Sequence, residues 1–334
     1  MLTLPPLEVL RPSSVAEAVA LLAKHPDARV LAGGTDIVPN LKYGMYDSRT
    51  LVALRGLASE LRYVREDEGT GELRLGALCT IDELAQNPVI QEKLPALADA
   101  AGQIAGPQLR RMGTLGGNLC LDTRCVYINQ SHFWRSALGF CLKKDGTQCF
   151  VVAQGKRCVA AASNDTAPVL LALSASVRTV SPRGERVIPL EQFYLADGIH
   201  NTVLAPDELL VEVRVPAAAA KLRQAFTKLR TRAAIDFPAL NLAVAMSLDS
   251  GHRLTGVRLC VSALAARPAL IKSLDDLTGQ SLETQADQDK FGRELGRRAQ
   301  KQCKPLTNIN IDPDWRRDVL PVLVRRTVAR ALLS

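Results

Sequence analysis

The sequence predicts an α+β fold, because strand and helix patterns do not alternate regularly along the chain. Short apolar strands mix with capped helices in the first hundred residues, where capping boxes occur at 14–17 and 80–83. A hairpin pattern follows at 176–189. In the last third, strand patterns precede helical patterns: strands at 225–229, 240–248 and 254–263, helices at 284–302 and 315–333.

Length and composition indicate a globular protein with room for two or three domains. The chain has 334 residues, of which 47% are hydrophobic and 23% charged. No apolar run reaches the roughly 18 residues of a membrane span, and the N-terminus lacks a signal-peptide layout, so we expect a cytoplasmic protein without membrane contact. The net charge of +8 is dispersed and aromatic residues make up only 4%, which argues against nucleic-acid binding.

A strand pattern at 29–32 runs directly into Gly33-Gly34-Thr35-Asp36, and a helical pattern follows at 37–43. Glycines allow close backbone approach and a helix start offers unpaired N–H groups, so this turn suits a phosphate. The alternative is a tight strand-to-helix turn with an ordinary N-cap. The dinucleotide fingerprint is absent, since it needs a third spaced glycine and a later acid.

Other patterns divide the chain further. We expect a helix at 167–173, and a strand at 208–215 that Pro216 ends, followed by a linker at 217–220. That linker is a candidate domain boundary. The remaining expected elements are strands at 50–54, 61–64 and 72–78 and a helix at 95–104.

A second glycine loop, Gly113-Thr114-Leu115-Gly116-Gly117-Asn118, also suits a phosphate. It is separated from the turn Ser163-Asn164-Asp165-Thr166-Ala167-Pro168 by a cysteine-rich segment. Five of the eight cysteines lie between them: Cys120, Cys125, Cys141, Cys149 and Cys158.

The spacing of these cysteines leaves three interpretations open: an iron–sulfur cluster, zinc, or no metal. Clustered thiols in a reducing compartment more often bind metal or do redox chemistry than form disulfides. The spacing is not that of a zinc ribbon or a ferredoxin, and His132 completes no zinc-finger pattern. Nearby basic residues are expected to lower the thiol pKa values. They are Arg124, Lys143, Lys144, Lys156 and Arg157.

Four segments resemble the FAD-binding subunits of the molybdenum hydroxylases, the family of xanthine dehydrogenase and aerobic carbon monoxide dehydrogenase. They are 30–37, 114–118, 163–168 and 209–216, and the pattern Lys228-x-x-x-Arg232-x-x-x-Asp236 extends the similarity. The resemblance implies a two-subdomain FAD-binding domain of the vanillyl-alcohol-oxidase/PCMH type, followed by a C-terminal α+β domain of the CO dehydrogenase flavoprotein type. The implied bounds are 1–216, with subdomains 1–56 and 57–216, and 217–334.

The same resemblance implies the cofactor-binding residues. FAD would lie in a groove between the two subdomains, with its pyrophosphate on the two glycine segments. Ile104 and Leu210 match apolar positions beside the flavin or adenine, Asp165 matches an acid that hydrogen-bonds the cofactor, and Lys228 matches a basic residue near the flavin. The residues of the glycine segments are Leu31, Ala32, Gly33, Gly34, Thr35, Asp36, Thr114, Gly116, Gly117 and Asn118.

Most members of the family pass directly from the second glycine loop to the Asn-Asp turn, whereas this chain inserts about 120–161. The insertion resembles that of the beta subunits of 4-hydroxybenzoyl-CoA reductases, which carry an additional [4Fe–4S] cluster. The motifs that match are Leu121-Asp122-Thr123-Arg124-Cys125 and Gln154-Gly155-Lys156-Arg157-Cys158. The resemblance makes Cys125, Cys141, Cys149 and Cys158 the ligands and leaves Cys120 as a spare thiol.

The implied assembly is a dimer of heterotrimers. A large subunit would hold the molybdenum cofactor and a small subunit two [2Fe–2S] clusters. A ferredoxin-like donor would supply the electrons that remove the phenolic hydroxyl of 4-hydroxybenzoyl-CoA. No residue of this chain is assigned as catalytic.

Three rival functions differ from this reading. One is a flavin subunit of another molybdenum hydroxylase that passes electrons outward to an acceptor. The others are a zinc-stabilised binding protein and a stand-alone flavoprotein oxidase. The oxidase would need an acid–base residue beside the flavin, and no convincing His or Tyr suggests itself.

Overall fold

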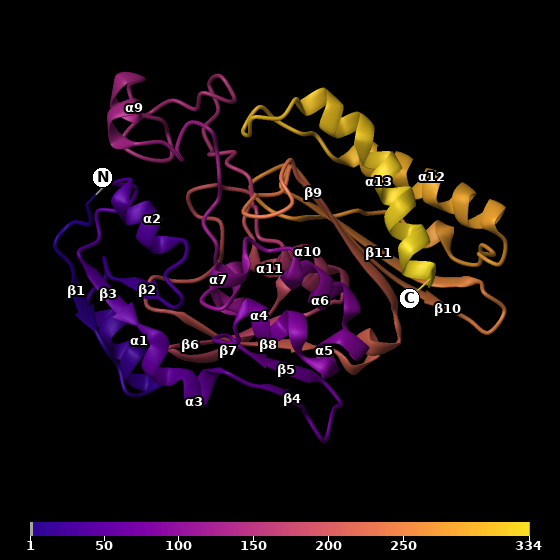
Figure 1. Cartoon of the computed structure of the whole chain (residues 1–334), viewed down its shortest axis with the longest axis horizontal. Helices are drawn as coiled ribbons and strands as arrows, with labels where there is room; N and C mark the ends of the chain where they lie inside the picture. The colour runs from indigo at the N-terminus through magenta and orange to yellow at the C-terminus, as the bar shows by residue number, and fades with distance from the viewer. Residues whose placement is uncertain (1–2, 334) are drawn as a thin grey trace.

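The computed structural model describes residues 3–333 and arranges their strands in three sheets (Figure 1). The first sheet is parallel, in the order β1-β3-β2, and helix α1 packs against it. Ser14 caps α1 by accepting a hydrogen bond from the N–H of Glu17. The elements of this part are β1 (Glu8–Leu10), α1 (Val15–Lys24), β2 (Arg29–Leu31), α2 (Ile37–Lys42), β3 (Thr50–Ala53) and α3 (Ala58–Leu61).

The second sheet has five antiparallel strands in the order β4-β5-β8-β6-β7. Its core is shared with helices α4, α6 and α10. Thr80 and Glu83 form a complete capping box at the start of α4, as the sequence predicted. The strands are β4 (Val64–Glu66), β5 (Leu73–Gly76), β6 (Ser176–Ser181), β7 (Gly184–Pro189) and β8 (Leu209–Val215); the helices are α4 (Ile81–Gln86), α5 (Pro88–Lys93), α6 (Pro95–Gly102), α7 (Pro107–Arg110), α8 (Leu115–Leu119), α10 (Thr166–Ala172) and α11 (Leu190–Phe193).

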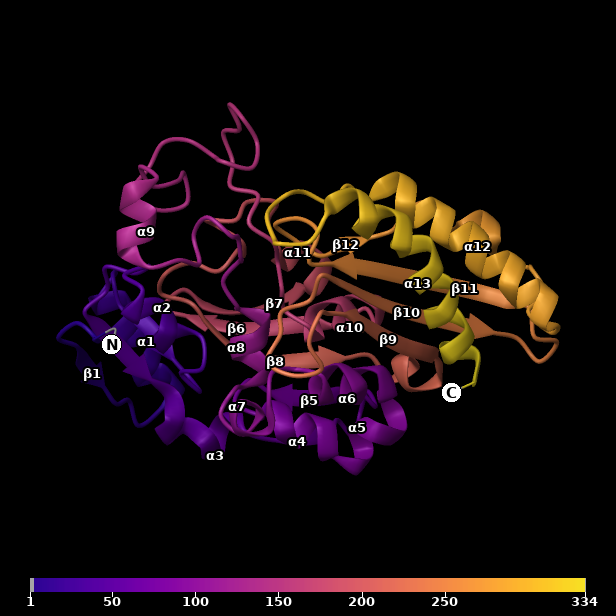
Figure 2. The ribbon, with the colours of Figure 1, turned by 45° about the horizontal axis from the view of Figure 1, so that its top comes forward.

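The third sheet is antiparallel, in the order β12-β11-β10-β9, and lies in the C-terminal part of the chain (Figure 2). Helix α13 packs on β9 and β10, and α12 packs along α13. Helix α10 contacts β10 and β11 as well as α6 and α8, and all of its residues are buried. The elements are β9 (Arg223–Leu229), β10 (Leu240–Leu248), β11 (Leu254–Ser262), β12 (Ala269–Leu270), α12 (Gln285–Gln302) and α13 (Pro313–Leu333).

Two expected elements differ from the structure. The strand expected at 61–64 is wrong: residues 58–61 form α3, and the strand begins only at Val64. Leu57 and Leu61 are both buried in the core of the first sheet, a spacing of four that suits a helix rather than a strand. The second glycine loop is itself a short helix, α8, with Thr114 as its N-cap.

The insertion at 120–161 contains one short helix, α9 (His132–Ala137), and otherwise consists of irregular chain. In Figure 1 it rises from the body of the molecule beside α2. Arg135 of α9 donates to the carbonyl oxygens of Tyr43 and Gly44, and the N–H of Val126 donates to the carbonyl of Asn308. The insertion is therefore held by contacts with both the N-terminal and the C-terminal part of the chain.

No helix within residues 3–333 combines the length and the apolar character needed to cross a bilayer.

Candidate cofactor site

The first glycine turn presents a row of free backbone donors. Gly33, Gly34, Thr35 and Asp36 connect β2 to α2, and Gly34 has a φ of +75°. Within the described chain, none of their four N–H groups donates to an acceptor. The segment is only partly buried, so these donors are accessible to a ligand. Successive unpaired N–H groups form a concave site that suits an anion such as a pyrophosphate.

Gly33 is required by close packing between the two glycine segments. A Cβ at this position would lie 1.7 Å from the carbonyl oxygen of Met112, so only glycine fits. The hydroxyl oxygen of Thr35 lies 3.5 Å from the position that a Cβ of Gly113 would take. The two segments, far apart in the sequence, therefore lie against each other.

The second glycine segment differs from the expectation in one respect. The N–H groups of its last four residues already have protein acceptors: Leu115 donates to Cys79, Gly116 to Ala77, and Gly117 and Asn118 to Thr114. They form the first turn of α8, so they are not free for a phosphate. What this segment offers is the exposed surface of Gly117 and the NH₂ group of Asn118, whose Oδ1 accepts from Thr166.

Asp165 and Lys228 form a buried ion pair, with 2.8 Å between Oδ2 and Nζ. Asn241 donates to the other carboxylate oxygen at 2.8 Å, and Lys228 also donates to the carbonyl of Gln103 at 3.2 Å. Burial raises the pKa of Asp165, while the positive charge of Lys228 opposes that rise. The pair joins the start of α10 to β9. The contacts of these two side chains with a cofactor stay a prediction.

Two buried amide oxygens lack partners among the described residues, one on Asn241, which bonds to Asp165, and one on Asn164, which precedes Asp165 in the sequence. Oδ1 of Asn164 and Oδ1 of Asn241 accept no hydrogen bond from any described residue. Buried acceptors are normally satisfied, so each is a candidate partner for a hydroxyl group of a bound ligand. Neither asparagine was predicted to contact the cofactor from the sequence, although Asn164 directly precedes Asp165.

The two predicted apolar contacts lie in different surroundings. Leu210 is buried in the core of the second sheet, whereas Ile104 is partly exposed at the edge of that core. The N–H of Ile235 donates to the carbonyl of Ala105, so the loop that contains Ile235 lies beside the chain that follows Ile104. Both stretches expose apolar side chains: Leu109 and Met112 in one, Ile235 and Phe237 in the other. Flavin contacts of Ile104 and Leu210 stay predictions.

Arg124 connects the first glycine turn to the insertion, a role that the sequence did not suggest. Its guanidinium forms an ion pair with Asp36 and lies over the ring of Phe237, 4.5 Å from the ring centroid. Arg124 directly precedes Cys125, so this one residue links the first glycine turn to the cysteine segment.

The four cysteines predicted as ligands line one cavity at the base of the insertion. Cys125, Cys141, Cys149 and Cys158 share it, whereas Cys120 is exposed elsewhere. In the described part of the chain, no three His, Cys, Asp or Glu side chains are close enough together to hold a single metal ion. The other lining residues are mostly apolar: Tyr127, Ile128, Leu142, Lys143, Phe150, Val151, Val159 and Ala160.

The expectation that basic residues lower the thiol pKa values is wrong for two of these cysteines. Burial raises the pKa of the Cys125 thiol to about 11 and also raises the pKa of Cys158. The basic side chains mostly lie elsewhere: Arg124 pairs with Asp36, and Lys144 pairs with Asp47. Lys156 and Arg157 are exposed to solvent. Of the five basic residues, Lys143 is the one that lines the cysteine cavity, as far as the described residues show.

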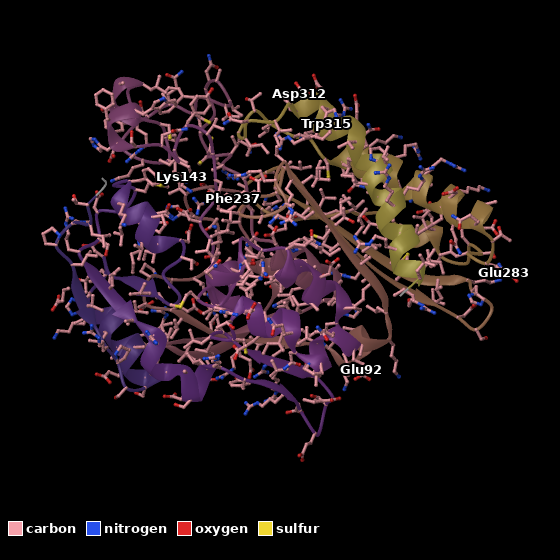
Figure 3. All side chains as sticks on the ribbon, in the orientation of Figure 1. Glu92, Lys143, Phe237, Glu283, Asp312 and Trp315 are labelled. Carbon is pink, nitrogen blue, oxygen red and sulfur yellow. The ribbon has the colours of Figure 1, made fainter. Side chains whose placement is uncertain are left out.

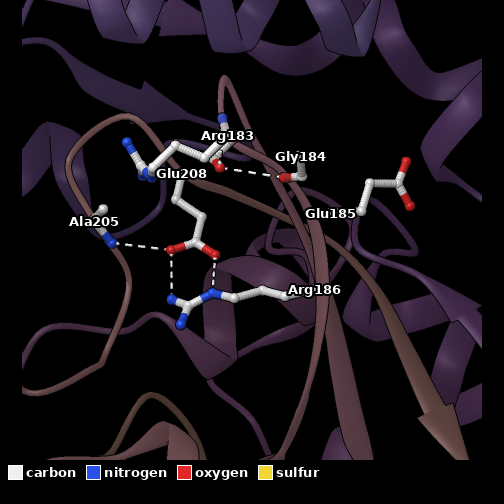
Figure 4. Close-up of a pocket in the computed structure, with 7 residues that line it drawn as sticks. Arg183, Gly184, Glu185, Arg186, Ala205 and Glu208 are labelled. Atoms are coloured by element: carbon white, nitrogen blue, oxygen red, sulfur yellow. Dashed lines mark hydrogen bonds and ion pairs between the residues drawn. The ribbon is translucent and has the colours of Figure 1, made fainter.

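A second cavity, at the β6–β7 hairpin, lies outside the predicted site (Figure 4). Arg186 donates to both carboxylate oxygens of Glu208, at 2.6 and 2.7 Å, and Arg183 pairs with Asp207 in the same way. Its arginines are therefore already neutralised, and nothing about the cavity suggests an anionic ligand.

Comparison with protein families matches nearly the whole chain to flavoprotein domains. Residues 5–218 match the FAD binding domain in molybdopterin dehydrogenase. Residues 224–331 match the CO dehydrogenase flavoprotein C-terminal domain. Together with the free N–H row, these matches define an FAD-binding protein of the molybdopterin dehydrogenase type.

Individual relatives support the same assignment. The chain is 28% identical to the carbon monoxide dehydrogenase medium chain of Hydrogenophaga pseudoflava, over 98% of this chain and 97% of that one. It is 31% identical to the putative xanthine dehydrogenase FAD-binding subunit of Escherichia coli K12, over 77% and 74% of the two chains. The chain therefore belongs to the FAD-binding medium subunits of the molybdenum hydroxylase family.

A solved structure confirms the predicted fold class. A carbon monoxide dehydrogenase from Hydrogenophaga pseudoflava that lacks the Mo-pyranopterin moiety of its cofactor superimposes with a TM-score of 0.79. Sequence identity is 26%, and the match covers 99% of both chains. The matched family descriptions name FAD and no iron–sulfur cluster, so the cysteine cavity goes beyond them.

Proposed function

We propose that this chain is the FAD- and [4Fe–4S]-carrying electron-transfer subunit of a cytoplasmic 4-hydroxybenzoyl-CoA reductase. The observation that carries the proposal is the convergence of four cysteines of the insertion on one cavity, where Cys125 directly follows Arg124, the ion-pair partner of Asp36 in the first glycine turn. The net reaction takes up two electrons and two protons, and converts the ring C–OH to C–H with release of water. FAD and the cluster supply electron transfer, and the residues of this chain bind and orient them.

The cavity has the donor set that a [4Fe–4S] cluster requires. Such a cluster binds four thiolates, one at each iron corner, so its ligands surround a volume rather than meet at one point. Four cysteines lining one largely apolar cavity match this arrangement. Their separation also agrees with the absence, among residues 3–333, of a group suited to a single ion. The N–H of Val152 lies 3.5 Å from the sulfur of Cys149 and can donate to it.

The outer face of the insertion suits an acidic electron donor such as a ferredoxin. Residues 120–161 contain six basic and two acidic residues, a net charge of +4 out of +8 for the whole chain. Helix α9 also exposes apolar side chains: Phe133 is 82% exposed, and Trp134 and Leu138 are exposed too. Lys156 and Arg157 are the exposed basic residues of the insertion, because the side chains of Arg135 and Lys143 are buried and Arg124 and Lys144 form ion pairs. Exposed apolar side chains together with positive charge favour association with a negative partner.

The remaining subunits follow from the family. We infer a large subunit with the molybdenum cofactor and a small subunit with two [2Fe–2S] clusters, assembled as a dimer of heterotrimers. The relatives that carry the words medium chain in their names support an assembly with a larger and a smaller partner.

A second candidate is the flavin subunit of a molybdenum hydroxylase that passes electrons outward. Similarity to carbon monoxide and xanthine dehydrogenase subunits favours it. The two candidates differ in the direction of electron flow. Reduction of 4-hydroxybenzoyl-CoA by the complex with reduced ferredoxin supports the first, and substrate oxidation with an added acceptor, without that reduction, supports the second.

The first test is an anaerobic purification of the full chain followed by flavin, iron and sulfide analysis. We expect about one FAD with about four iron and four sulfide per chain. Replacing any one of Cys125, Cys141, Cys149 or Cys158 by Ser should remove the iron while FAD stays bound. Cys120→Ser is the matched control, because its thiol lies outside the cavity. Full iron in the four cavity variants, or none in the natural chain, would contradict the cluster.

A further inference from the structure

Lys143 is the one charged side chain among the described residues that line the cysteine cavity. It follows Cys141 by two positions and lies at the base of the insertion (Figure 3). Its side chain is only 8% exposed. A buried ammonium group is costly unless it is paired and hydrogen-bonded, so its position here needs an explanation.

The ammonium group is held by an extensive set of acceptors. Nζ lies 2.6 Å from Oδ1 of Asp122, 2.6 Å from the hydroxyl of Thr123 and 2.7 Å from the carbonyl oxygen of Gly198. The carbonyl of Thr123 lies at 3.1 Å. Two separate chain segments, 122–123 and the loop at Gly198, therefore fix the position of this charge, and it cannot swing out into solvent without breaking all of these contacts.

The same contacts connect the charge to two of the predicted ligands. Thr123 is separated from Cys125 by one residue, and the N–H of Gly198 donates to the carbonyl of Cys158 at 2.8 Å. A Cβ at position 198 would lie 2.7 Å from the sulfur of Cys158, so Gly198 packs directly against that thiol. Lys143 thus fixes the backbone on which Cys125 and Cys158 stand.

We propose that Lys143 is a positioning residue that also sets the reduction potential of the group bound by the four cysteines. This inference rests on the proposed cluster. A one-electron reduction adds one negative charge to the cluster, and a fixed positive charge at the cavity wall stabilises the reduced form. Cluster potentials respond to local charge and solvent exposure, and an interaction between partly buried charges changes an equilibrium constant tenfold or more.

The experiment is a redox titration of the full chain with dithionite and mediators, followed by the EPR signal of the reduced cluster. Lys143→Met should lower the ratio of reduced to oxidised cluster at a fixed potential by about tenfold, a midpoint lower by ~59 mV. Lys144→Met is the matched control, because Lys144 pairs with Asp47 and Asp145 outside the cavity. In Lys144→Met the ratio of reduced to oxidised cluster should change less than about threefold, a midpoint shift below ~28 mV.

A double variant separates the charge from its structural effect. Lys143→Met leaves the carboxylate of Asp122 unpaired, so Lys143→Met/Asp122→Asn restores the local net charge and should bring the ratio back to within about threefold of the natural chain. A double variant that stays as low as the single one would overturn the electrostatic part of the inference. An unchanged potential in Lys143→Met would overturn all of it.

Iron content keeps the two proposals distinguishable. Each variant should hold about four iron per chain, and thermal unfolding of the iron-free forms checks that they fold. Lys143→Gln replaces Lys143→Met if the latter does not fold. A natural chain without iron contradicts the proposed cluster, whereas a natural chain with iron and a Lys143 variant of unchanged potential contradicts only the role of Lys143.

Discussion

Gly33 shows how one missing side chain shapes the cofactor site. The backbone at this residue touches the carbonyl of Met112, so the two glycine segments approach more closely than any Cβ allows. This contact holds the first glycine turn in place, and the free N–H groups of that turn are the main feature that suits a pyrophosphate.

At the residue scale, we predict that Gly33→Ala weakens FAD binding. The new Cβ must push the turn away from Met112, which we expect to cost about 1–3 kcal/mol as overpacking and to misplace the donors. Flavin fluorescence titration measures the affinity, and urea unfolding measures the stability.

The control for this prediction is Gly102→Ala. Gly102 ends α6, and no atom lies within 4 Å of the position its Cβ would take. This substitution should leave FAD affinity and stability essentially unchanged. If Gly33→Ala behaves like Gly102→Ala, the close approach is not needed for the site.

Helix α2 is the element that holds the insertion. Its last carbonyl groups lack partners within the helix, and the chain continues through Gly44 with a φ of +64°. Arg135, which is 2% exposed, donates to the carbonyls of Tyr43 at 2.8 Å and Gly44 at 3.0 Å. A positive charge at a helix C-terminus is also favourable for the helix dipole. The Arg135 side chain thus both caps the C-terminus of α2 and docks the insertion against that helix.

At the element scale, we predict that Arg135→Gln loosens the insertion without removing FAD. Loss of a charge-assisted hydrogen bond costs about 1.5–3 kcal/mol, which increases the population of the undocked segment tenfold or more. Chymotrypsin should cleave within 120–161 correspondingly faster, and mass spectrometry locates the cuts. Arg157→Gln, an exposed change in the same segment, should cleave at the natural rate. Equal rates for both variants would show that Arg135 does not hold the insertion.

Across the whole molecule, buried and surface contacts join the C-terminal sheet to the rest. The Asp165–Lys228 pair links α10 to β9, and Arg330 of α13 pairs with Asp99 of α6 at 2.8 Å. The first sheet has its own core, which also includes Leu209 and Val211 of β8. The first glycine turn follows β2 of the first sheet, and the second glycine segment begins α8, which packs in the core of the second sheet. A cofactor bound between the two glycine segments would therefore contact both of these parts.

At this scale we predict that removing FAD lowers the stability of the whole chain. A ligand that binds only the folded state adds about 2.7 kcal/mol to the free energy of unfolding at 100 times its Kd. Calorimetry of the flavin-free chain with and without added FAD measures this gain. FMN lacks the adenosine and one phosphate, so at equal concentration it should stabilise much less. Equal stabilisation by FMN would mean that the pyrophosphate turn contributes little.

Local patterns predicted many elements well. The capping box at Thr80 starts α4, the helix expected at 284–302 is α12, and the strand that Pro216 ends is β8. The mistakes occurred where tertiary contacts outweigh local preference. Leu57 and Leu61 reach the first core as part of helical turns. The second glycine segment begins α8, and its N–H groups bond to Ala77, Cys79 and Thr114. The sequence revealed the glycines of this second segment but not the acceptors of the segment's N–H groups.

The sequence by itself determined the α+β class, the order of its elements, the glycine turn before α2 and the four cysteines of the insertion. These follow from hydrophobic periodicity, capping and residue type, which act over a few residues. Only the tertiary structure decided that the four cysteines share a cavity, that Arg124 reaches Asp36, and that Lys143 meets Gly198. The insertion is mostly irregular and has no periodicity to predict its path. Its position depends on hydrogen bonds to residues far away in the chain, and such contacts form only when the whole molecule folds.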